Sequence, residues 1–587
     1  MRRTRIAAGL AGVVAASGAA AQVRFADATA RLGLDGIEAQ HAAFADLDAD
    51  GFDDLIVQRT RVFLNRPAGG GARRFVEVER SGLPERRRGD ITVFADVDND
   101  GMADAIVSRY LDVNNPDFEP PPAGTPRGLA WLRGNGDGTF GDPVGAFTPI
   151  DAATRATACA IAVADLPPAD GRLDLVVGHW YERYGGGLAG FASDVLRQRE
   201  DGGFERLPWP TDGVAFDGEA DAGGRPTYGV LVADLLEDSR SGVVPEILEL
   251  NYGRRWNRLW RPTEGGAVDV AASVKLDGDA IRHGRYPEWL KERARTDPRF
   301  ERDDERPFRA NGNTFDAAVG DVDNDGDFDV LLTEITHGWA GESSDRSRVL
   351  LREDGFAGPL FVAREGLSLD RVPADPAVRS WNQGDIYGAL ADFDLDGRLD
   401  VLLCSSDYPD NQRLRIFAQR NGGLVDVTSW SGIDHIGAGQ PSLADFDGDG
   451  DLDIVVGQSF NRLPASQRAG RTPRLRIFEN RAADGDARRG LVLRLVGAPE
   501  RGVARDPLGA IVRVTAVVGG ERITQSRQLV GIGGHQGKQH AFVVHAALGG
   551  APAERVEILW PGADGLRTTL TNVPAGTHVV RAADASR

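Results

Sequence analysis

The chain of 587 residues is too long for one ordinary hydrophobic core, so we expect several domains or a repeat architecture. Its 74 glycines, 31 prolines and low aromatic content of 7% suit a β protein rich in turns. The formal charge of −20 argues against nucleic acid or an anionic membrane as a partner.

The N-terminus has the organisation of a secretory signal peptide over residues 1–21. A basic segment, Met1–Arg5, precedes an apolar segment, Ile6–Ala16, and a run of small residues that suits cleavage, Ala19–Ala21. No later apolar run reaches the length of about 18 residues that a membrane helix needs. We therefore expect a secreted or periplasmic protein without an integral membrane segment after cleavage.

Five acidic loops of the form D-x-D-x-D-G-x-x-D recur along the chain. Each follows an apolar residue and then Ala or Gly, and each leads directly into an apolar run. Carboxylates crowded at this spacing repel one another unless a cation lies among them. Ca²⁺ takes about 6–8 oxygen ligands, and glycine at position six allows the loop to fold around the ion.

An EF-hand would need Glu at position twelve and flanking helices, but that position is Val or Leu in a β-type run. The pattern therefore predicts a strand, a calcium loop and a strand. We expect about five Ca²⁺ sites, with side chains at positions one, three, five and nine and a backbone carbonyl at position seven as ligands. These positions are Asp46, Asp48, Asp50, Phe52 and Asp54; Asp96, Asp98, Asp100, Met102 and Asp104; Asp321, Asp323, Asp325, Asp327 and Asp329; Asp392, Asp394, Asp396, Arg398 and Asp400; Asp445, Asp447, Asp449, Asp451 and Asp453.

Two degenerate copies lie between the second and third intact loops. The segment Asp165–Asp174 has Pro167 and Pro168 in its middle and one inserted residue, and the segment Asp234–Glu246 has lost the spacing. We expect neither to bind calcium as the intact loops do.

Each loop is followed by a third strand, a glycine turn and a short outer strand. The resulting unit has four strands and occurs seven times, which is typical of a β-propeller. The segment Val23–Thr29 resembles an outer strand that precedes the first unit, and the seventh unit lacks one. We therefore predict an all-β fold in which residues 22–482 form a seven-bladed β-propeller and the N-terminal strand completes the last blade.

Two insertions interrupt the period. Residues 182–220 are rich in glycine, with an expected outer strand around Phe204. Residues 275–311 contain a short helix candidate at Pro287–Arg295 followed by a dense charged stretch. An insertion of this kind either carries function on one face of the propeller or is a solvated loop. The two cysteines, Cys159 and Cys404, are expected to be buried free thiols rather than a disulfide.

Residues 483–587 contain no acidic loop and read as a small β domain. Strands are predicted at Leu491–Val496, Ala510–Val514, Ile523–Gln525 and Val556–Trp560.

These motifs resemble known families. The loops resemble the FG-GAP/VCBS repeats of the integrin α-subunit propeller. The tail resembles the ASPIC/UnbV domain through four stretches in the same order, although Ala547–Gly550 stands where that family more often has a Phe-Gly-Leu-Gly run. The four stretches are Gly509–Val514, Gly531–Gln536, Ala547–Gly549 and Leu559–Gly562. The combination resembles secreted bacterial proteins and the cartilage acidic protein group, a resemblance that implies the fold and calcium binding but no particular activity.

Candidate groups beyond the loops are few. Aromatic residues in His179–Tyr181, His337–Trp339 and Trp381–Asn382 would lie at one rim, where they stack on ligands or, as we favour, pack between blades. His535 and His540 indicate a turn rather than a metal site.

No motif for a catalytic nucleophile, a zinc protease or a phosphate loop is present. We expect a monomeric extracellular scaffold that binds a protein or glycan, and no enzyme. The alternative is a calcium-dependent polysaccharide lyase on the same fold, which should show basic residues around a calcium in the central channel.

Overall fold

The computed structural model describes residues 22–585 of the chain with internal gaps. The gaps are residues 87–88, 109–128, 147–156, 182–189, 208–223, 237–241, 253–255, 264–265, 279–287, 299–312, 338–344, 357, 372–381, 406–412, 461–462, 464, 485–488 and 563–564. The predicted signal peptide therefore lies outside the described residues. No helix among the described residues has the length and apolar character needed to cross a membrane.

Most of the described chain consists of antiparallel sets of four strands, each built as the sequence predicts. The first three sets are β2 (Ala42–Ala45), β3 (Asp54–Val57), β4 (Arg61–Gly69) and β5 (Ala72–Glu77); β6 (Ile91–Ala95), β7 (Asp104–Ser108), β8 (Leu129–Gly134) and β9 (Phe140–Ala146); β10 (Ala158–Ala164), β11 (Asp174–His179), β12 (Asp194–Gln198) and β13 (Phe204–Arg206).

Four more sets follow, and the acidic loops connect the first and second strands of their sets. These sets are β14 (Thr227–Ala233), β15 (Glu246–Asn251), β16 (Arg258–Thr263) and β17 (Gly266–Asp269); β18 (Thr314–Gly320), β19 (Asp329–His337), β20 (Arg348–Gly355) and β21 (Gly358–Ser368); β22 (Asn382–Ala391), β23 (Asp400–Ser405), β24 (Leu414–Arg420) and β25 (Gly423–Asp426); β26 (Ala438–Ala444), β27 (Asp453–Gln458), β28 (Arg476–Asn480) and β1 (Phe25–Asp27).

The last set includes the N-terminal strand, in the arrangement predicted for it. β1 pairs antiparallel with β28, with Phe25 opposite Asn480 and Asp27 opposite Phe478. The pairing covers what would otherwise be an open edge of the last set, and it joins the two ends of the repeat region.

The sets follow one another in a ring. The first strand of a set lies beside the first strand of the next, from β6 through β10, β14, β18, β22 and β26, and β26 in turn lies beside β2. An apolar cluster that includes Ile56, Phe94 and Ala105 connects the first set to the second. This cyclic order is compatible with a β-propeller.

Burial decreases from the inside of each set to its outside. Every residue of β3 is buried, because neighbouring sets cover both of its faces, and such strands are apolar throughout. The outermost strand of the same set, β5, alternates between exposed and buried residues because only one of its faces is covered. The apolar run after each acidic loop is therefore the strand packed between two neighbours.

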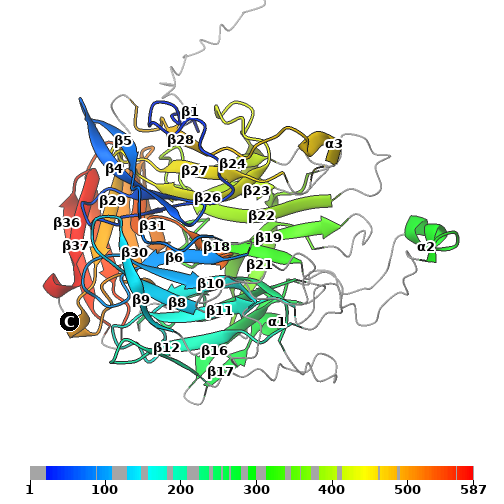
Figure 1. The fold of residues 1–587 in the computed structure, drawn as a ribbon, viewed down its shortest axis with the longest axis horizontal. Helices are drawn as coiled ribbons and strands as arrows, with labels where there is room; N and C mark the ends of the chain where they lie inside the picture. Colours follow the sequence, from blue (N-terminus) through cyan, green and yellow to red (C-terminus); the bar gives the residue numbers. More distant parts are fainter. Residues whose placement is uncertain are drawn as a thin grey trace, which may run out of the picture.

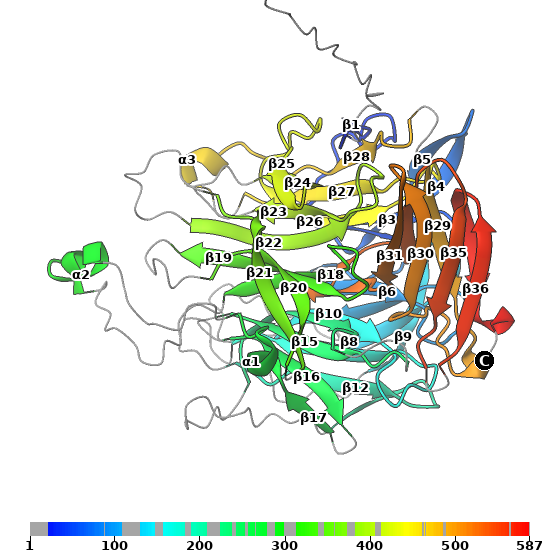
Figure 2. The same ribbon diagram turned by 180° about the vertical axis from the view of Figure 1, so that it is seen from behind.

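The C-terminal residues form two further sheets. Their strands are β29 (Arg489–Val496), β30 (Ile511–Val518), β31 (Glu521–Gln528), β34 (Val543–Leu548), β35 (Ala553–Leu559), β36 (Arg567–Val573) and β37 (Gly576–Arg581), in the orders β34-β29-β37 and β31-β30-β35-β36. All four predicted strands are present. The sheets lie across one end of the ring, and the helices α2 (Glu288–Ala294) and α3 (Ala465–Arg468) lie at the opposite end (Figures 1 and 2).

The tail, predicted as a small β domain, also pairs with the ring, a contact that the sequence did not predict. A hairpin of β32 (Ile532–His535) and β33 (Lys538–Gln539) enters the ring, where β32 pairs with the first strand of the fourth set. Gly229 lies opposite His535 and Val230 opposite Gly534. The fourth set of the ring and the hairpin from the tail therefore share one sheet.

Several smaller predictions are confirmed. Both cysteines are buried and free. The predicted helix within the second insertion is α2, and the outer strand around Phe204 is β13. Residues 338–344 and 372–381, which include two of the predicted rim aromatics, lie outside the described residues.

The aromatic residues of the third set pack between neighbouring sets, which was the favoured reading. Trp180 and Tyr181 are buried. The Trp180 ring lies 3.9 Å from that of Tyr228 and 5.9 Å from that of Tyr252, measured between centroids. These rings pack together at the contact between the third and fourth sets.

Candidate metal centres and the central hairpin

Each acidic loop is held in shape by its own aspartates. In the first loop the Asp46 carboxylate accepts a hydrogen bond from the Gly51 amide at 3.1 Å. The Asp54 carboxylate accepts one from the Leu47 amide at 2.9 Å and another from the Asn65 amide at 2.7 Å. The last aspartate therefore fastens the loop to the third strand, and the same two contacts recur in the other four loops.

The fold gathers carboxylate oxygens of each loop within 4.8 Å of one another. The five groups are Asp46, Asp48 and Asp50; Asp96, Asp98 and Asp104; Asp321, Asp323 and Asp325; Asp392, Asp394 and Asp400; Asp445, Asp447 and Asp453. Each group combines positions one and three with position five or nine. The carbonyl ligand predicted at position seven stays a prediction.

The loops carry strongly unfavourable negative charge. Burial, together with the charge of neighbouring aspartates, raises the pKa of Asp54 to about 8 and that of Asp96 to about 8. The pKa of Asp451 is raised to about 9 for the same reasons. Deprotonation of these carboxyls at neutral pH is therefore costly unless a cation offsets the charge.

Several loop oxygens are buried and accept no hydrogen bond. They are Asp46 Oδ1, Asp48 Oδ1, Asp98 Oδ1, both oxygens of Asp321, Asp447 Oδ1 and Asp451 Oδ1. A buried oxygen without a partner is unfavourable. Hard oxygen donors without nitrogen or sulfur suit Ca²⁺, so the residues present fit that ion.

In the degenerate loop of the third set, an arginine lies among the polar groups of the loop. Arg197 donates hydrogen bonds to the carbonyls of Leu166 and Pro167, at 3.1 and 2.8 Å. Its guanidinium also lies 3.7 Å from the Asp174 carboxylate. A side chain of the protein thus supplies the positive charge within this loop. Among the described residues, neither degenerate loop forms a group suited to a metal ion.

The C-terminal sheets rest on the loops. Arg494 of β29 forms an ion pair of 2.6 Å with Asp53 of the first loop. The Asp506 carboxylate accepts a hydrogen bond of 2.7 Å from the Asp96 amide in the second loop. His545 of β34 donates to the Gly450 carbonyl of the last loop at 3.0 Å. The face that would hold the cations is therefore also the docking face of the tail.

The hairpin β32–β33 is bound to the ring through Lys538. The Lys538 Nζ donates to Asp316 Oδ2 at 2.6 Å, to the Ala317 carbonyl at 3.2 Å and to the Gly388 carbonyl at 2.5 Å. Both charged side chains are almost fully buried, at 5% and 0% exposure. All three ammonium protons have acceptors, so the pair is structural.

The remaining hairpin residues bind the other sets. Gln539 exchanges two hydrogen bonds of 2.9 Å with the Phe94 backbone, and the Gln536 amide donates to the Cys159 carbonyl at 3.1 Å. The contacts of His535 with Tyr228, of His540 with Leu443 and of Gln536 with Arg59 complete a circuit of all seven sets. The hairpin fills the centre of the ring.

The two histidines of the hairpin do not form a metal site. Burial lowers the pKa of His535 to about 3 and that of His540 to about 3, so both are neutral. His535 binds the Tyr228 carbonyl at 2.9 Å, and His540 accepts from the Leu443 amide at 3.1 Å. This outcome agrees with the turn predicted there.

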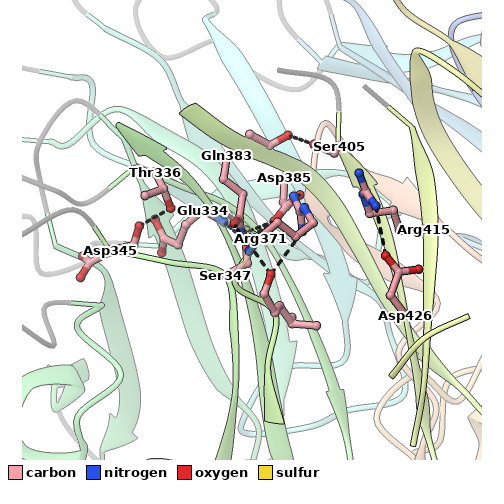
Figure 3. Close-up of polar contacts among 12 residues, drawn as sticks. Glu334, Thr336, Asp345, Ser347, Arg371, Gln383, Asp385, Ser405, Arg415 and Asp426 are labelled. Carbon is pink, nitrogen blue, oxygen red and sulfur yellow. Dashed lines mark hydrogen bonds and ion pairs between the residues drawn. The ribbon is translucent and has the colours of Figure 1, made fainter. Parts of the chain in front are cut away.

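A second polar cluster lies where β19 and β22 pair and join the fifth and sixth sets (Figure 3). The buried Asp385 carboxylate binds Arg371 at 2.5 Å, Ser347 Oγ at 2.6 Å and Gln383 at 3.2 Å. The pKa of neighbouring Glu334 is raised to about 8 by burial. The serine is fully buried and donates to a carboxylate, so the cluster connects strands and offers no nucleophile.

Sequence reasoning missed two features of these sites. The first is the central hairpin, whose only sequence signal was a glycine-rich run. Glycines permit close approach to other chain segments. Gly534 has a φ of +78°, and a Cβ there would lie 1.8 Å from Asp316 Oδ1. The arginines that pair with loop aspartates lie on later strands, and nothing in the loop pattern points to them.

The fold and the loops define an all-β repeat protein with an acidic loop in five of its sets. A family model described as an FG-GAP-like repeat matches residues 392–456, which span the loop of the sixth set and that of the last. A second model, described as ASPIC and UnbV, matches residues 501–586. The chain thus carries an FG-GAP-like repeat and a C-terminal ASPIC/UnbV domain, as the resemblance predicted.

Other comparisons add little. No curated protein matches the chain. Among solved structures, the chain is similar to one described as a lectin of Agrocybe aegerita that recognises non-reducing terminal N-acetylglucosamine. The identity is 15% and the TM-score 0.35, over 66% of this chain and 79% of that one.

Proposed function

We propose that this protein is a calcium-stabilised, extracellular β-propeller that serves as a binding scaffold. In this proposal the seven four-stranded sets are blades, and each of the five intact loops holds one Ca²⁺. The observation that carries it is the gathering of buried, unpartnered aspartate oxygens in these loops. A bound cation would satisfy those oxygens and offset the charge, so each ion would stabilise the turn between two strands of a blade.

The filled centre of the ring supports a scaffold over an enzyme. A lyase of the kind considered above would need basic groups lining an open channel. Lys538 and both hairpin histidines do lie at the centre, but each is buried and bonded to the ring. We therefore propose no enzymatic activity.

Export and an extracellular partner belong to the same proposal. The segment before Gln22 has the sequence features of a signal peptide, and extracellular calcium is abundant enough for loops of modest affinity. The partner would be a protein or glycan bound by a monomer. Because the docked tail covers the loop face, we place the partner on the opposite face, where α2 lies (Figure 1).

Calcium removal tests the proposal. Binding to the folded state stabilises it by about 2.7 kcal/mol per site at a free concentration of 100 times Kd. Chelation by EDTA should therefore lower the thermal midpoint, and added Ca²⁺ should restore it. Asp449→Ala should remove only the stabilisation that calcium binding by one loop contributes. A melting curve that EDTA leaves unchanged would contradict calcium binding by all five loops.

A partner screen tests the binding role separately. Glycans and matrix proteins are arrayed and probed with the purified chain, with and without Ca²⁺. Retention of one ligand class that depends on calcium supports the scaffold. Release of unsaturated products from acidic polysaccharides would instead support the lyase.

A further inference from the structure

The five loops differ in the charges that surround them. In four loops an arginine of the same set pairs with a loop aspartate. Arg66 lies 2.5 Å from Asp48, and Arg133 lies 2.6 Å from Asp98. The corresponding pairs of the other two loops are Arg364 with Asp323, Arg352 with Asp327, and Arg420 with Asp394 and Asp396. A cation that enters any of these loops competes with a guanidinium already present.

In the part of the chain that the structure describes, the last loop, Asp445–Asp453, has no such arginine. None of the ion pairs formed by the described residues involves an aspartate of this loop. The backbone register shows which residue takes the place of the arginine. The amide that binds the ninth-position aspartate belongs to Gly134 in the second set and to Asn480 in the last. The residue before it is Arg133 in the second set and Glu479 in the last.

Glu479 also engages the arginines that could have reached the loop. Its carboxylate binds Arg31 at 2.5 Å and Arg481 at 2.9 Å. Arg481 holds the register position of Arg66 and Arg420, but it pairs with Glu479 and, at 3.6 Å, with Asp484. The arginine is thus held outside the loop.

A second observation points to a cation in this loop. Asp451 is fully buried, and its Oδ1 accepts no hydrogen bond. The other oxygen of this carboxylate accepts from the Ala483 amide at 2.8 Å. Asp447 Oδ1 is also without a partner. The charge of Glu479 acts on both Asp447 and Asp449. Buried negative charge without a cationic partner is strongly unfavourable.

We propose that the loop Asp445–Asp453 is the tightest of the five calcium sites and that Glu479 contributes to it, while arginines weaken the other four. The affinity of calcium loops rises with the number of charged ligands and with rigidity. This loop has five aspartates and an adjacent glutamate, and among the described residues no arginine forms an ion pair with its aspartates. The inference depends on the proposed calcium binding.

Calcium titration of the full mature chain tests it. Metal-free protein is titrated with Ca²⁺ in the presence of a chromophoric chelator, which resolves sites of different affinity. We expect one tight ion and a weaker class. Glu479→Gln should weaken the tight site by about 10-fold or more, as loss of groups that support a metal ligand does. The matched control is Glu77→Gln, which removes an equal charge from the exposed pair with Arg61.

A second variant tests the same inference by creating a tight site, so the result does not depend on a substitution that could destabilise the last loop. Arg133 is 53% exposed and holds the register position of Glu479, so Arg133→Glu should convert the second loop to the tight class. The chain would then bind two tight ions. Five ions of equal affinity, or a tight site unaffected by Glu479→Gln, would overturn the inference but leave the proposed function intact. Failure to bind any calcium would overturn both.

Discussion

The buried pair between Lys538 and Asp316 allows the sharpest test of how the tail is held. Lys538→Met keeps most of the apolar stem but removes the ammonium group. The Asp316 carboxylate would then retain only the amide hydrogen bonds from His535 and Gly388, at 3.0 and 2.9 Å. Removing one partner of a buried ion pair costs about 3–5 kcal/mol, because the other charge stays buried without compensation.

The free energy of unfolding is measured by urea denaturation in saturating Ca²⁺. Lys291→Met on α2 is the control, since that lysine pairs at the surface with Glu288 at 3.2 Å and should contribute less than about 0.5 kcal/mol. The double variant Lys538→Met/Asp316→Asn should recover part of the loss, because no buried charge then remains. A loss below about 1 kcal/mol for Lys538→Met would refute a hairpin held in the ring by this pair.

Three further outcomes are expected. In EDTA, the free energy of unfolding should decrease as the pH rises from about 4 to about 8. Burial raises the pKa of Asp54 and that of Asp329 to about 8, so over this range the folded state binds more protons than the unfolded state. Denaturation at pH 5.5 and pH 8 checks this, and stability that rises with pH would contradict it. Gly534→Ala should displace the hairpin and lower the thermal midpoint far more than Gly519→Ala, which shares a positive φ but meets no atom within 4 Å. Arg197→Ala should destabilise the chain by about 1–3 kcal/mol without abolishing calcium uptake, because two loop carbonyls lose a charged donor; an unchanged midpoint would argue against its role in place of a cation.

The docking of the tail on the loop face also has a consequence for calcium. Arg527 of β31 is half-buried. Burial raises the pKa of Asp321 and that of Asp392, the first aspartates of two neighbouring loops, and the charge of Arg527 partly offsets both rises. A cation in either loop and the arginine of the tail therefore act on the same carboxylates.

Local spacing was enough to predict the acidic loops and the strands around them. The position-nine aspartates, such as Asp54, bind backbone amides within their own set, and glycine at position six is needed within the same nine residues. Apolar runs after the loops are buried on both faces, and their composition alone indicates this. The N-terminal strand was predictable because one set lacked an outer strand and one strand lacked a set.

Contacts between distant residues were beyond that reasoning. Lys538 and Asp316 are 222 positions apart, and neither has a sequence signal that names its partner. The hairpin could not be placed in the ring from its glycines, nor could the arginines be assigned to their loops. The sequence by itself determined the repeat, its loops and their chemistry, because these depend on short spacing. Only the tertiary structure decided what fills the centre and which loop lacks a competing arginine, because those depend on strands brought together by folding.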